Sequence, residues 1–306
     1  MPNGETDRQQ ILEQIVPATP NAISETIGFL GGKWISLGEF ALGIDDIGFR
    51  QAVIAVERLR TYGGRIFQVT GHAARWQATL EQLGIQLNEP FGAVLDDLMA
   101  RNESFVASQG DVGITAFATP GKLGGEATFG VHLNLLDTEL NKARREQGQA
   151  IVVTDVVQPP NASWPRSIKV RCRLHYFLAD RFARESDPNA LGLLVDDDGT
   201  ITETSVANVA MVSDGVIYSP QSAQVLPGIS EAVIRDLAAK QGMRWVRERI
   251  SVARIKDADE VLLMGTDTGL WFANQINGVW KSSQPGPVCQ KLQVAFARHV
   301  GGTEKS

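Results

Sequence analysis

The sequence predicts a two-domain protein of mixed α/β (α+β) class. Its 306 residues are more than one hydrophobic core usually organises. Strand-like and helix-like apolar patterns alternate along the chain, and a charged segment, Asp137–Gln149, interrupts them near the middle. We therefore expect an N-terminal domain over residues 1–137, a connection over residues 138–148 and a C-terminal domain over residues 149–306.

In the first half, glycine pairs mark two strand hairpins. The Gly31-Gly32 and Gly63-Gly64 turns each separate two apolar stretches, which are Thr26–Leu30 with Lys33–Leu37, and Gly48–Tyr62 with Arg65–Val69. Apolar residues at helical spacing predict helices over His72–Leu83 and about Phe91–Arg101. Two further strands are expected near Val112–Ala118 and Ala127–Leu136.

The second half repeats this alternation. Strands are expected over Ala150–Val157 and near Ser167, followed by a helix over about Leu174–Glu185. Three short strands then follow, because Asp198-Gly199 and Asp214-Gly215 are strong hairpin turns. A helix that opens at Pro227–Ser230 runs to Gly242, and Glu260–Met264 is expected to be the last buried strand.

Composition and charge exclude several classes of function. A net charge of -6 leaves no basic surplus to neutralise a nucleic-acid backbone. The N-terminus lacks the order of a signal peptide, and no apolar run approaches the ~18 residues of a membrane span. Two cysteines give no disulfide framework, which favours the cytoplasm. Four scattered histidines without a paired motif argue against a protein-bound metal, and no GxGxxG follows a first strand as a Rossmann site would require.

Four features carry candidate chemistry. Lys169 lies beside apolar residues, and burial of a lysine lowers its pKa and makes the neutral amine available as a nucleophile. Glu203 follows a hairpin turn, and Arg75 lies in a helical pattern beside an apolar stripe. The sequence LPGIS, residues 226–230, opens a helix whose free amides suit a phosphate. Taken singly, each of these features more often has an ordinary structural or surface role.

Taken together, the motifs resemble those of the fold type IV (class IV) pyridoxal-phosphate enzymes, which include branched-chain and D-amino acid aminotransferases and aminodeoxychorismate lyase. The resemblance runs from about Ile35 to Gly278. In the first half, matching positions lie in the run from Asp46 to Tyr62 and in the pair formed by His72 and Arg75. In the second half, IKVRCRL, TETSVAN, SDGVIYSP, LPGIS, DADEVLLMGT and QINGV follow in the family's order. The resemblance implies a small N-terminal α/β domain and a large C-terminal domain with a barrel-like β core.

The resemblance also implies roles for individual residues. Lys169 would hold pyridoxal 5'-phosphate as an aldimine and later move the proton between substrate and cofactor. Glu203 would keep the pyridine nitrogen protonated, whereas Asn208 would be structural. The phosphate would be bound by Arg75, the amides of Ile229 and Ser230, and the Thr266 hydroxyl.

The chain departs from the family at positions that concern the substrate. Ala52 and Val56 stand where relatives have glycine and an aromatic residue, and ITAFATPG lacks the arginine with which relatives often bind the substrate carboxylate. Either the substrate is an amine whose acid group lies elsewhere, or another arginine supplies that charge. Arg50, two residues before Ala52, is the first candidate and Arg171 and Arg173 follow, unless these are surface arginines. The residues expected to face the substrate are Phe49, Arg50, Glu57, Thr119 and Asp267.

The function expected from the resemblance is transfer of an amino group between an amino acid or amine and a keto acid. An aminodeoxychorismate lyase-like reaction is the alternative, although the lyase has a catalytic threonine where this chain has Glu57. A cofactor-binding pseudo-enzyme is a third possibility that the altered substrate loops leave open. Relatives suggest a homodimer with small-molecule substrates, and the sequence does not identify the donor, the acceptor or the hand of the substrate.

Overall fold

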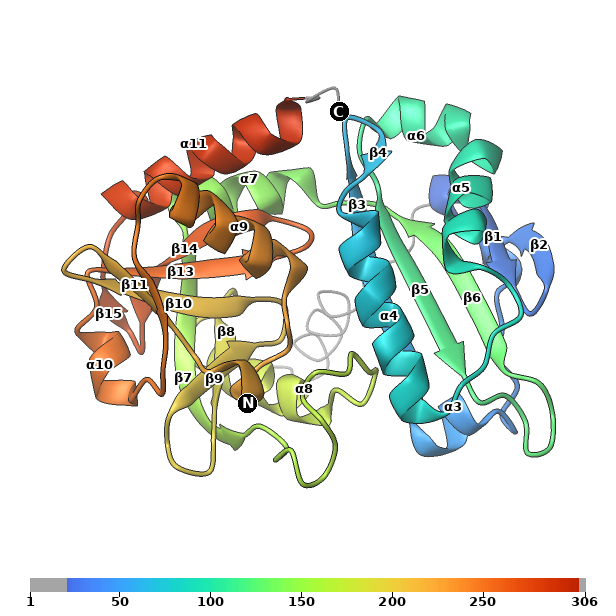
Figure 1. Cartoon of the computed structure of the whole chain (residues 1–306), viewed down its shortest axis with the longest axis horizontal. Helices are drawn as coiled ribbons and strands as arrows, with labels where there is room; N and C mark the ends of the chain where they lie inside the picture. The colour runs from blue at the N-terminus through green and yellow to red at the C-terminus, as the bar shows by residue number, and fades with distance from the viewer. Residues whose placement is uncertain (1–20, 303–306) are drawn as a thin grey trace, which may run out of the picture.

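The computed structural model describes residues 21–302 and places two β-sheets side by side, each with its own helices (Figure 1). Every strand of the first sheet comes from residues before 135, and every strand of the second from residues after 148. The mixed α/β fold class is therefore as expected. The two sheets divide where the connection was predicted, although the division into separate folding domains stays a prediction.

The N-terminal sheet has six strands in the order β2-β1-β6-β5-β3-β4. Its elements are α2 (Asn21–Ser24), β1 (Ile27–Leu30), β2 (Lys33–Ser36), α3 (Ile47–Gln51), β3 (Ala55–Tyr62), β4 (Arg65–Ile66), α4 (Val69–Leu83), α5 (Phe91–Arg101), α6 (Glu103–Gln109), β5 (Gly113–Thr119) and β6 (Thr128–Asn134). Both predicted hairpins form. The start of the second was wrong, because residues 47–51 form the helix α3, which Asp46 caps by accepting a hydrogen bond from the Gly48 amide.

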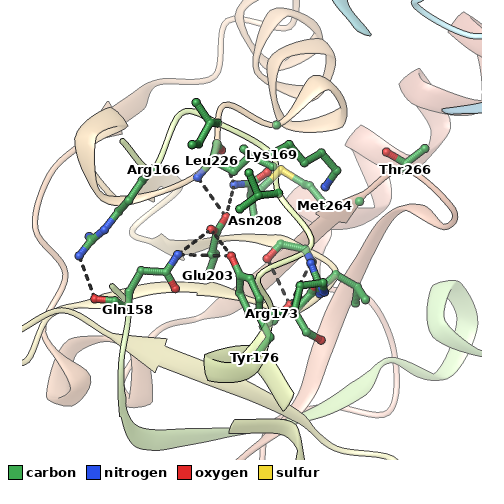
Figure 2. Close-up of a pocket in the computed structure, with 18 of the residues that line it drawn as sticks. Gln158, Arg166, Lys169, Arg173, Tyr176, Glu203, Asn208, Leu226, Met264 and Thr266 are labelled. Carbon is green, nitrogen blue, oxygen red and sulfur yellow. Dashed lines mark hydrogen bonds between the residues drawn. The ribbon is translucent and has the colours of Figure 1, made fainter. Parts of the chain in front are cut away.

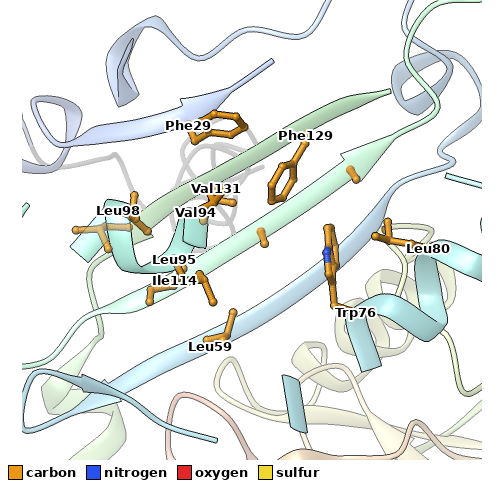
Figure 3. Close-up of a cluster of buried hydrophobic side chains, with 14 of the residues drawn as sticks. Phe29, Leu59, Trp76, Leu80, Val94, Leu95, Leu98, Ile114, Phe129 and Val131 are labelled. Atoms are coloured by element: carbon orange, nitrogen blue, oxygen red, sulfur yellow. The ribbon is translucent and has the colours of Figure 1, made fainter. Parts of the chain in front are cut away.

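Helices α4 and α5 cover one face of this sheet, and the core lies between them and the strands (Figure 3). Trp76 of α4 is 1% exposed and stacks on Phe91 of α5 with ring centroids 5.4 Å apart. Leu59, Ile114 and their neighbours alternate along the strands and fill the same space. This packing fixes α4, the helix that carries His72 and Arg75, against β3.

The C-terminal sheet closes into a six-stranded barrel of β10, β13, β14, β7, β8 and β9, because β9 also pairs with β10. Its elements are β7 (Gln149–Val157), α8 (Leu174–Arg184), β8 (Leu191–Val195), β9 (Ile201–Thr204), β10 (Asn208–Ser213), β11 (Val216–Ser219), α9 (Ile229–Lys240), β12 (Trp245–Arg247), α10 (Val252–Lys256), β13 (Glu260–Gly265), β14 (Gly269–Ile276), β15 (Val279–Trp280) and α11 (Pro287–Gly301). Apolar side chains such as Leu193 and Leu263 fill the barrel. Helices α9 and α11 pack outside it.

The predicted connection contains the helix α7 (Thr138–Gln147), which packs against β14. Three expectations for the C-terminal half were wrong. Four short strands, β8 to β11, lie where three were expected, because the chain also turns between β9 and β10. The stretch near Ser167 is a loop that makes one isolated bridge to β3, through Val170 and Ala55. Glu260–Met264 is not the last buried strand, because the longer β14 follows and pairs with it. β14 begins at Gly269, directly after the buried strand β13. Apart from Asp267-Thr268 the sequence shows no turn signal between the two strands, which explains why β14 was not predicted.

Candidate active site

Lys169 lies in the loop between β7 and α8, and two elements of the N-terminal half hold its backbone. Its amide donates a hydrogen bond to Thr79 Oγ1 of α4 at 3.2 Å, and its carbonyl accepts one from the Val56 amide of β3 at 2.9 Å. The loop also passes close to β9 and β10, since Lys169, Glu203 and Asn208 line one cavity. The lysine therefore occupies the junction between the two halves.

The surroundings of Lys169 favour its neutral form. Burial of the side chain, followed by the positive charge of Arg75, lowers the pKa of Lys169 to about 8. The carboxylates of Glu57 and Glu203 act in the opposite direction but less strongly. At pH 7 roughly a tenth of the amine is then unprotonated, which is far more than in a lysine with the ordinary pKa, and this neutral form is the nucleophile.

Glu203 lies at the point where the barrel closes. It pairs with Asn208 across the β9–β10 contact and is 4% exposed. Its Oε1 accepts hydrogen bonds from Tyr176 Oη at 2.8 Å and Gln158 Nε2 at 3.2 Å, and its Oε2 accepts them from Asn208 Nδ2 and the Leu226 amide, both at 3.2 Å (Figure 2). Burial nevertheless raises the pKa of Glu203, because no cation pairs with it directly in the part of the chain that the structure describes.

Arg75 is held in place by a second buried glutamate. Glu57 of β3 is fully buried and accepts hydrogen bonds from Arg75 Nη2 at 2.5 Å and Nε at 3.1 Å. His72 Nδ1 lies 2.8 Å from the same carboxylate. Although burial opposes the charge, Arg75 and then His72 lower the pKa of Glu57 to about 2. Arg75 Nη1 also donates to the Pro227 carbonyl at 2.8 Å, so three of its five N–H groups are used and two remain available.

The N-terminus of α9 forms another wall. Gly228 caps this 12-residue helix with φ -71° and ψ 131°, and no side chain caps its first turn. A Cβ on Gly228 would lie 1.8 Å from Asn208 Oδ1, so only glycine allows the helix start to approach β10 this closely. The first amides of α9, at Ile229 and Ser230, therefore remain available for an anion.

All six residues predicted to hold the cofactor line a single cavity, which we name the lysine–glutamate cavity. Its lining includes Arg75, Lys169, Glu203, Ile229, Ser230 and Thr266. These residues come from five separate segments of the chain. Figure 2 shows Lys169 and Thr266 on one side and Glu203 with its donors Tyr176 and Asn208 on the other. The structure thus brings together all the predicted cofactor residues, while their roles stay predictions.

A second cavity, which we name the arginine cavity, adjoins the first at Lys169. It shares Lys169, Arg173, Ser205, Val206, Gly265 and Thr266 with the first, and its volume is about 370 Å³. Four arginines line it, namely Arg58, Arg144, Arg171 and Arg173. Of the predicted substrate residues, only Asp267 lies here, and Arg58 holds it through two contacts of 2.9 Å.

The other predicted substrate residues lie outside the linings of both cavities. Phe49 and Arg50 are exposed on α3. Thr119 is buried, and its hydroxyl donates to Asp46 at 3.0 Å, which fixes the start of α3. Both carboxylate oxygens of Glu57 are occupied by Arg75 and His72, so this geometry favours a positioning role for Glu57 over a substrate contact.

Sequence reasoning missed several residues of the site. Tyr176 and Gln158, which donate to Glu203, stand in patterns that an ordinary helix and loop would also produce. Arg58 and Arg144 were also missed. A signal for Arg58 existed, since with Glu57 it places charged side chains within the buried strand β3.

The sequence matches the family model of the class IV amino-transferases over residues 55–276. The D-alanine aminotransferase of Staphylococcus aureus (strain N315) is 25% identical over 286 residues, which cover 89% of this chain and 97% of that protein. The branched-chain-amino-acid aminotransferase of Pseudomonas aeruginosa is 33% identical over 111 residues, or 36% of each chain.

Solved structures show the same fold. The branched-chain amino acid aminotransferase of Escherichia coli superposes with a TM-score of 0.82 at 20% identity and covers 92% of this chain and 97% of its own. The branched-chain amino acid aminotransferase of T.th., solved with pyridoxamine 5'-phosphate, gives a TM-score of 0.80 at 20% identity and covers 92% and 96%.

Proposed function

Because the chain belongs to the class IV aminotransferase family, we propose that it transfers an amino group between an amino acid or amine and a keto acid, with pyridoxal 5'-phosphate held on Lys169. The observation that carries the proposal is the convergence of Lys169, Glu203 and Arg75 on one cavity from distant segments. The loop that carries Lys169 contacts β3 and α4, and this contact between the two halves makes the convergence possible.

The donors and acceptors of the lysine–glutamate cavity fit this cofactor. Lys169 provides an amine for an aldehyde, Glu203 a carboxylate for a ring nitrogen, and Arg75 with the start of α9 a set of N–H donors for a phosphate. The close approach at Gly228 leaves the helix amides open on the phosphate side. When bound, pyridoxal 5'-phosphate supplies an aldehyde that takes up the substrate amine and a ring that withdraws electrons from the substrate carbon.

The residues of the chain would do the remaining work. Lys169 Nζ, whose pKa is about 8, would hold the cofactor covalently until the substrate amine displaces it. The freed amine would then take a proton from the substrate carbon and return it to the carbon that had carried the aldehyde. Glu203 balances a positive ring nitrogen, and the four donors around its carboxylate hold it in position. Glu57 holds Arg75 in the orientation that leaves two N–H groups for the phosphate.

The proposal includes a homodimer and a cytoplasmic location. An apolar stripe on α8 supports the dimer, since Leu174, Phe177, Leu178 and Phe182 are between 39% and 66% exposed. These residues begin five positions after Lys169 and repeat at helical spacing. Cys172 and Cys289 are unpaired, as suits a reducing compartment. In residues 21–302, no helix is both long enough and apolar enough to cross a membrane.

Reduction of the purified protein with borohydride, followed by peptide mapping, tests the proposal. We expect a phosphopyridoxyl group on Lys169, because its buried amine has the lowered pKa that the reaction needs. Lys169→Ala should lose the label and roughly 10⁴-fold of the transamination rate, whereas Lys33→Ala, which changes an exposed residue at the start of β2, should retain both. Labelling at Lys33, Lys122 or Lys240 in place of Lys169 would contradict the assignment.

A further inference from the structure

The arginine cavity has far more positive than negative charge. Besides Lys169, its lining contains four arginines and one acidic residue, Asp267. Arg58 uses that carboxylate fully, because its Nε and Nη2 each contact one oxygen at 2.9 Å. The remaining three guanidinium groups therefore share a cavity that holds no further carboxylate among its lining residues.

Two of these three arginines are held by neutral groups. Arg144 Nε donates to Gln149 Oε1 at 2.6 Å, and its guanidinium lies 5.4 Å from the centre of the Trp271 ring. Arg173 donates to the Ser205 carbonyl and lies over the ring of Tyr176. Arg171 differs from both, since none of the described residues forms a hydrogen bond or an ion pair with its guanidinium, which stays accessible to solvent.

The backbone places the side chains of Arg171 and Lys169 on the same face of their segment. The Val56 amide donates to the Lys169 carbonyl and the Arg171 amide donates to the Ile54 carbonyl at 3.0 Å, with Val170 bridged to Ala55 between them. In such an extended segment alternate side chains lie on the same face. Lys169 and Arg171 accordingly line the arginine cavity together, while Val170 lies between them in the chain.

A buried donor in the same lining also lacks a partner. Trp271 of β14 is 1% exposed, and its indole Nε1 forms no hydrogen bond in the part of the chain that the structure describes. Indole nitrogen is a donor only, so an acceptor would satisfy it. The Arg171 guanidinium and the Trp271 indole N–H are both donors without an acceptor among the described residues. A negatively charged acceptor would satisfy them and would also offset the excess positive charge of the arginines.

We propose that the arginine cavity binds the carboxylate of the substrate and that Arg171 is the residue that determines this specificity. The inference rests on the proposed function, since it places the reacting amine at Lys169, on the boundary of the two cavities. The enzyme accordingly acts on amino acids and keto acids and discriminates against amines without an acid group. Arg171 supplies the carboxylate-binding arginine that ITAFATPG lacks. Arg50 lies on α3, outside the lining of the arginine cavity.

Kinetics on the holoenzyme test the role of Arg171. The substrates are both enantiomers of alanine and of 2-aminobutyrate, each compared with the amine of the same carbon skeleton without the carboxylate. Arg171→Ala should lower kcat/KM for the acids roughly 30-fold or more and change that for the amines by less than about threefold. Arg171→Lys should recover part of the loss because it keeps the charge. Arg65→Ala, an exposed arginine of β4, serves as the control and should behave as wild type.

Equilibrium binding provides a readout that does not depend on turnover. The dissociation constants of the unreactive acids butyrate and glutarate, measured by isothermal titration calorimetry, should rise at least roughly 30-fold in Arg171→Ala and stay unchanged in Arg65→Ala. Equal losses for acids and amines, or unchanged constants for butyrate and glutarate, would overturn the role of Arg171. A wild type that carries no cofactor on Lys169 would instead contradict the proposed function, so the two failures are distinguishable.

Discussion

Two buried glutamates of this protein have opposite electrostatic surroundings. Glu57 in the N-terminal half is paired with Arg75 and His72, which lower its pKa to about 2. Glu203 in the barrel is surrounded by four donors that are neutral, and burial raises its pKa. Glu57 thus has its counter-charge within the protein, whereas the charge of Glu203 is compensated only in part. A carboxylate of the second kind is suited to a cation that arrives with a ligand, such as a protonated ring nitrogen.

The comparison also explains how the two halves divide the task. Glu57 belongs to a cluster whose charges are balanced without a ligand. This cluster fixes the orientation of Arg75 and leaves two of its N–H groups unused. Glu203 belongs to a cluster whose hydrogen bonds are complete but whose charge is not. Mutating Glu57 should therefore affect mainly the stability of the fold, and mutating Glu203 mainly the rate of the reaction.

Of the two glutamates, Glu203 should have the larger effect on turnover. Glu203→Gln keeps the shape of the side chain but cannot balance a positive ring nitrogen, so we expect the transamination rate to fall by roughly 10²- to 10⁴-fold while the cofactor remains bound. Steady-state kinetics together with the cofactor content per chain measure both quantities. Glu260→Gln, which alters a glutamate that accepts from the Val288 and Cys289 amides outside both cavities, should leave the rate unchanged.

An unchanged rate in Glu203→Gln would show that the carboxylate serves only the closure of the barrel. Loss of the cofactor together with the rate would show that Glu203 acts in binding, and the contrast with Glu57 would then fail. Glu203→Asp provides a finer test, since it keeps the charge but moves it away from Tyr176 and the Leu226 amide. We expect its rate to lie between those of wild type and Glu203→Gln.

Removing the charge of Glu57 should show mainly as instability. Glu57→Gln leaves Arg75 and its charge buried without a carboxylate, and breaking such a pair costs about 3–5 kcal/mol in the free energy of unfolding. Urea unfolding at neutral pH measures this loss. Glu126→Gln, which alters an exposed loop residue, is the matched control and should unfold as wild type does. A loss below about 1 kcal/mol would mean that the Glu57 cluster is not the anchor that its geometry indicates.

The sequence was most informative where a single residue type answers a chemical need. Lys169, Glu203 and Arg75 were found because a nucleophilic amine, a carboxylate and a guanidinium occur in a familiar order, and the structure places them on one cavity. Long periodic elements such as α4 and α5 were also predicted with close bounds. These elements depend on local patterns of apolar residues, which a sequence displays directly.

The parts that could not be predicted depend on contacts between distant segments. The closure of the barrel at Glu203 and Asn208 needs two strands to meet once the rest of the sheet is in place, and no local pattern encodes that. The same holds for the burial of Glu57, which follows from α4 packing on β3, and for the grouping of Arg58, Arg144 and Arg171 around one cavity. Charged residues in a sequence look alike until their partners are known.

The smallest expected effect is a change of stability with pH that separates the two glutamates. Since the folded protein lowers the pKa of Glu57 from 4.5 to about 2, Glu57 contributes stability above pH 4.5, and this contribution is lost as the pH falls from 4.5 toward 2. The loss amounts to about 3 kcal/mol for this shift. Glu203 works in the opposite sense, because its raised pKa means that the folded state holds its proton more tightly than the unfolded chain does.

Urea unfolding of wild type and Glu57→Gln from about pH 7 to about pH 3 measures how much stability the Glu57 charge contributes at each pH. The two free-energy curves should converge as the pH falls below 4.5, because protonated Glu57 is as uncharged as glutamine; curves that stay parallel would show that Glu57 carries no stabilising charge.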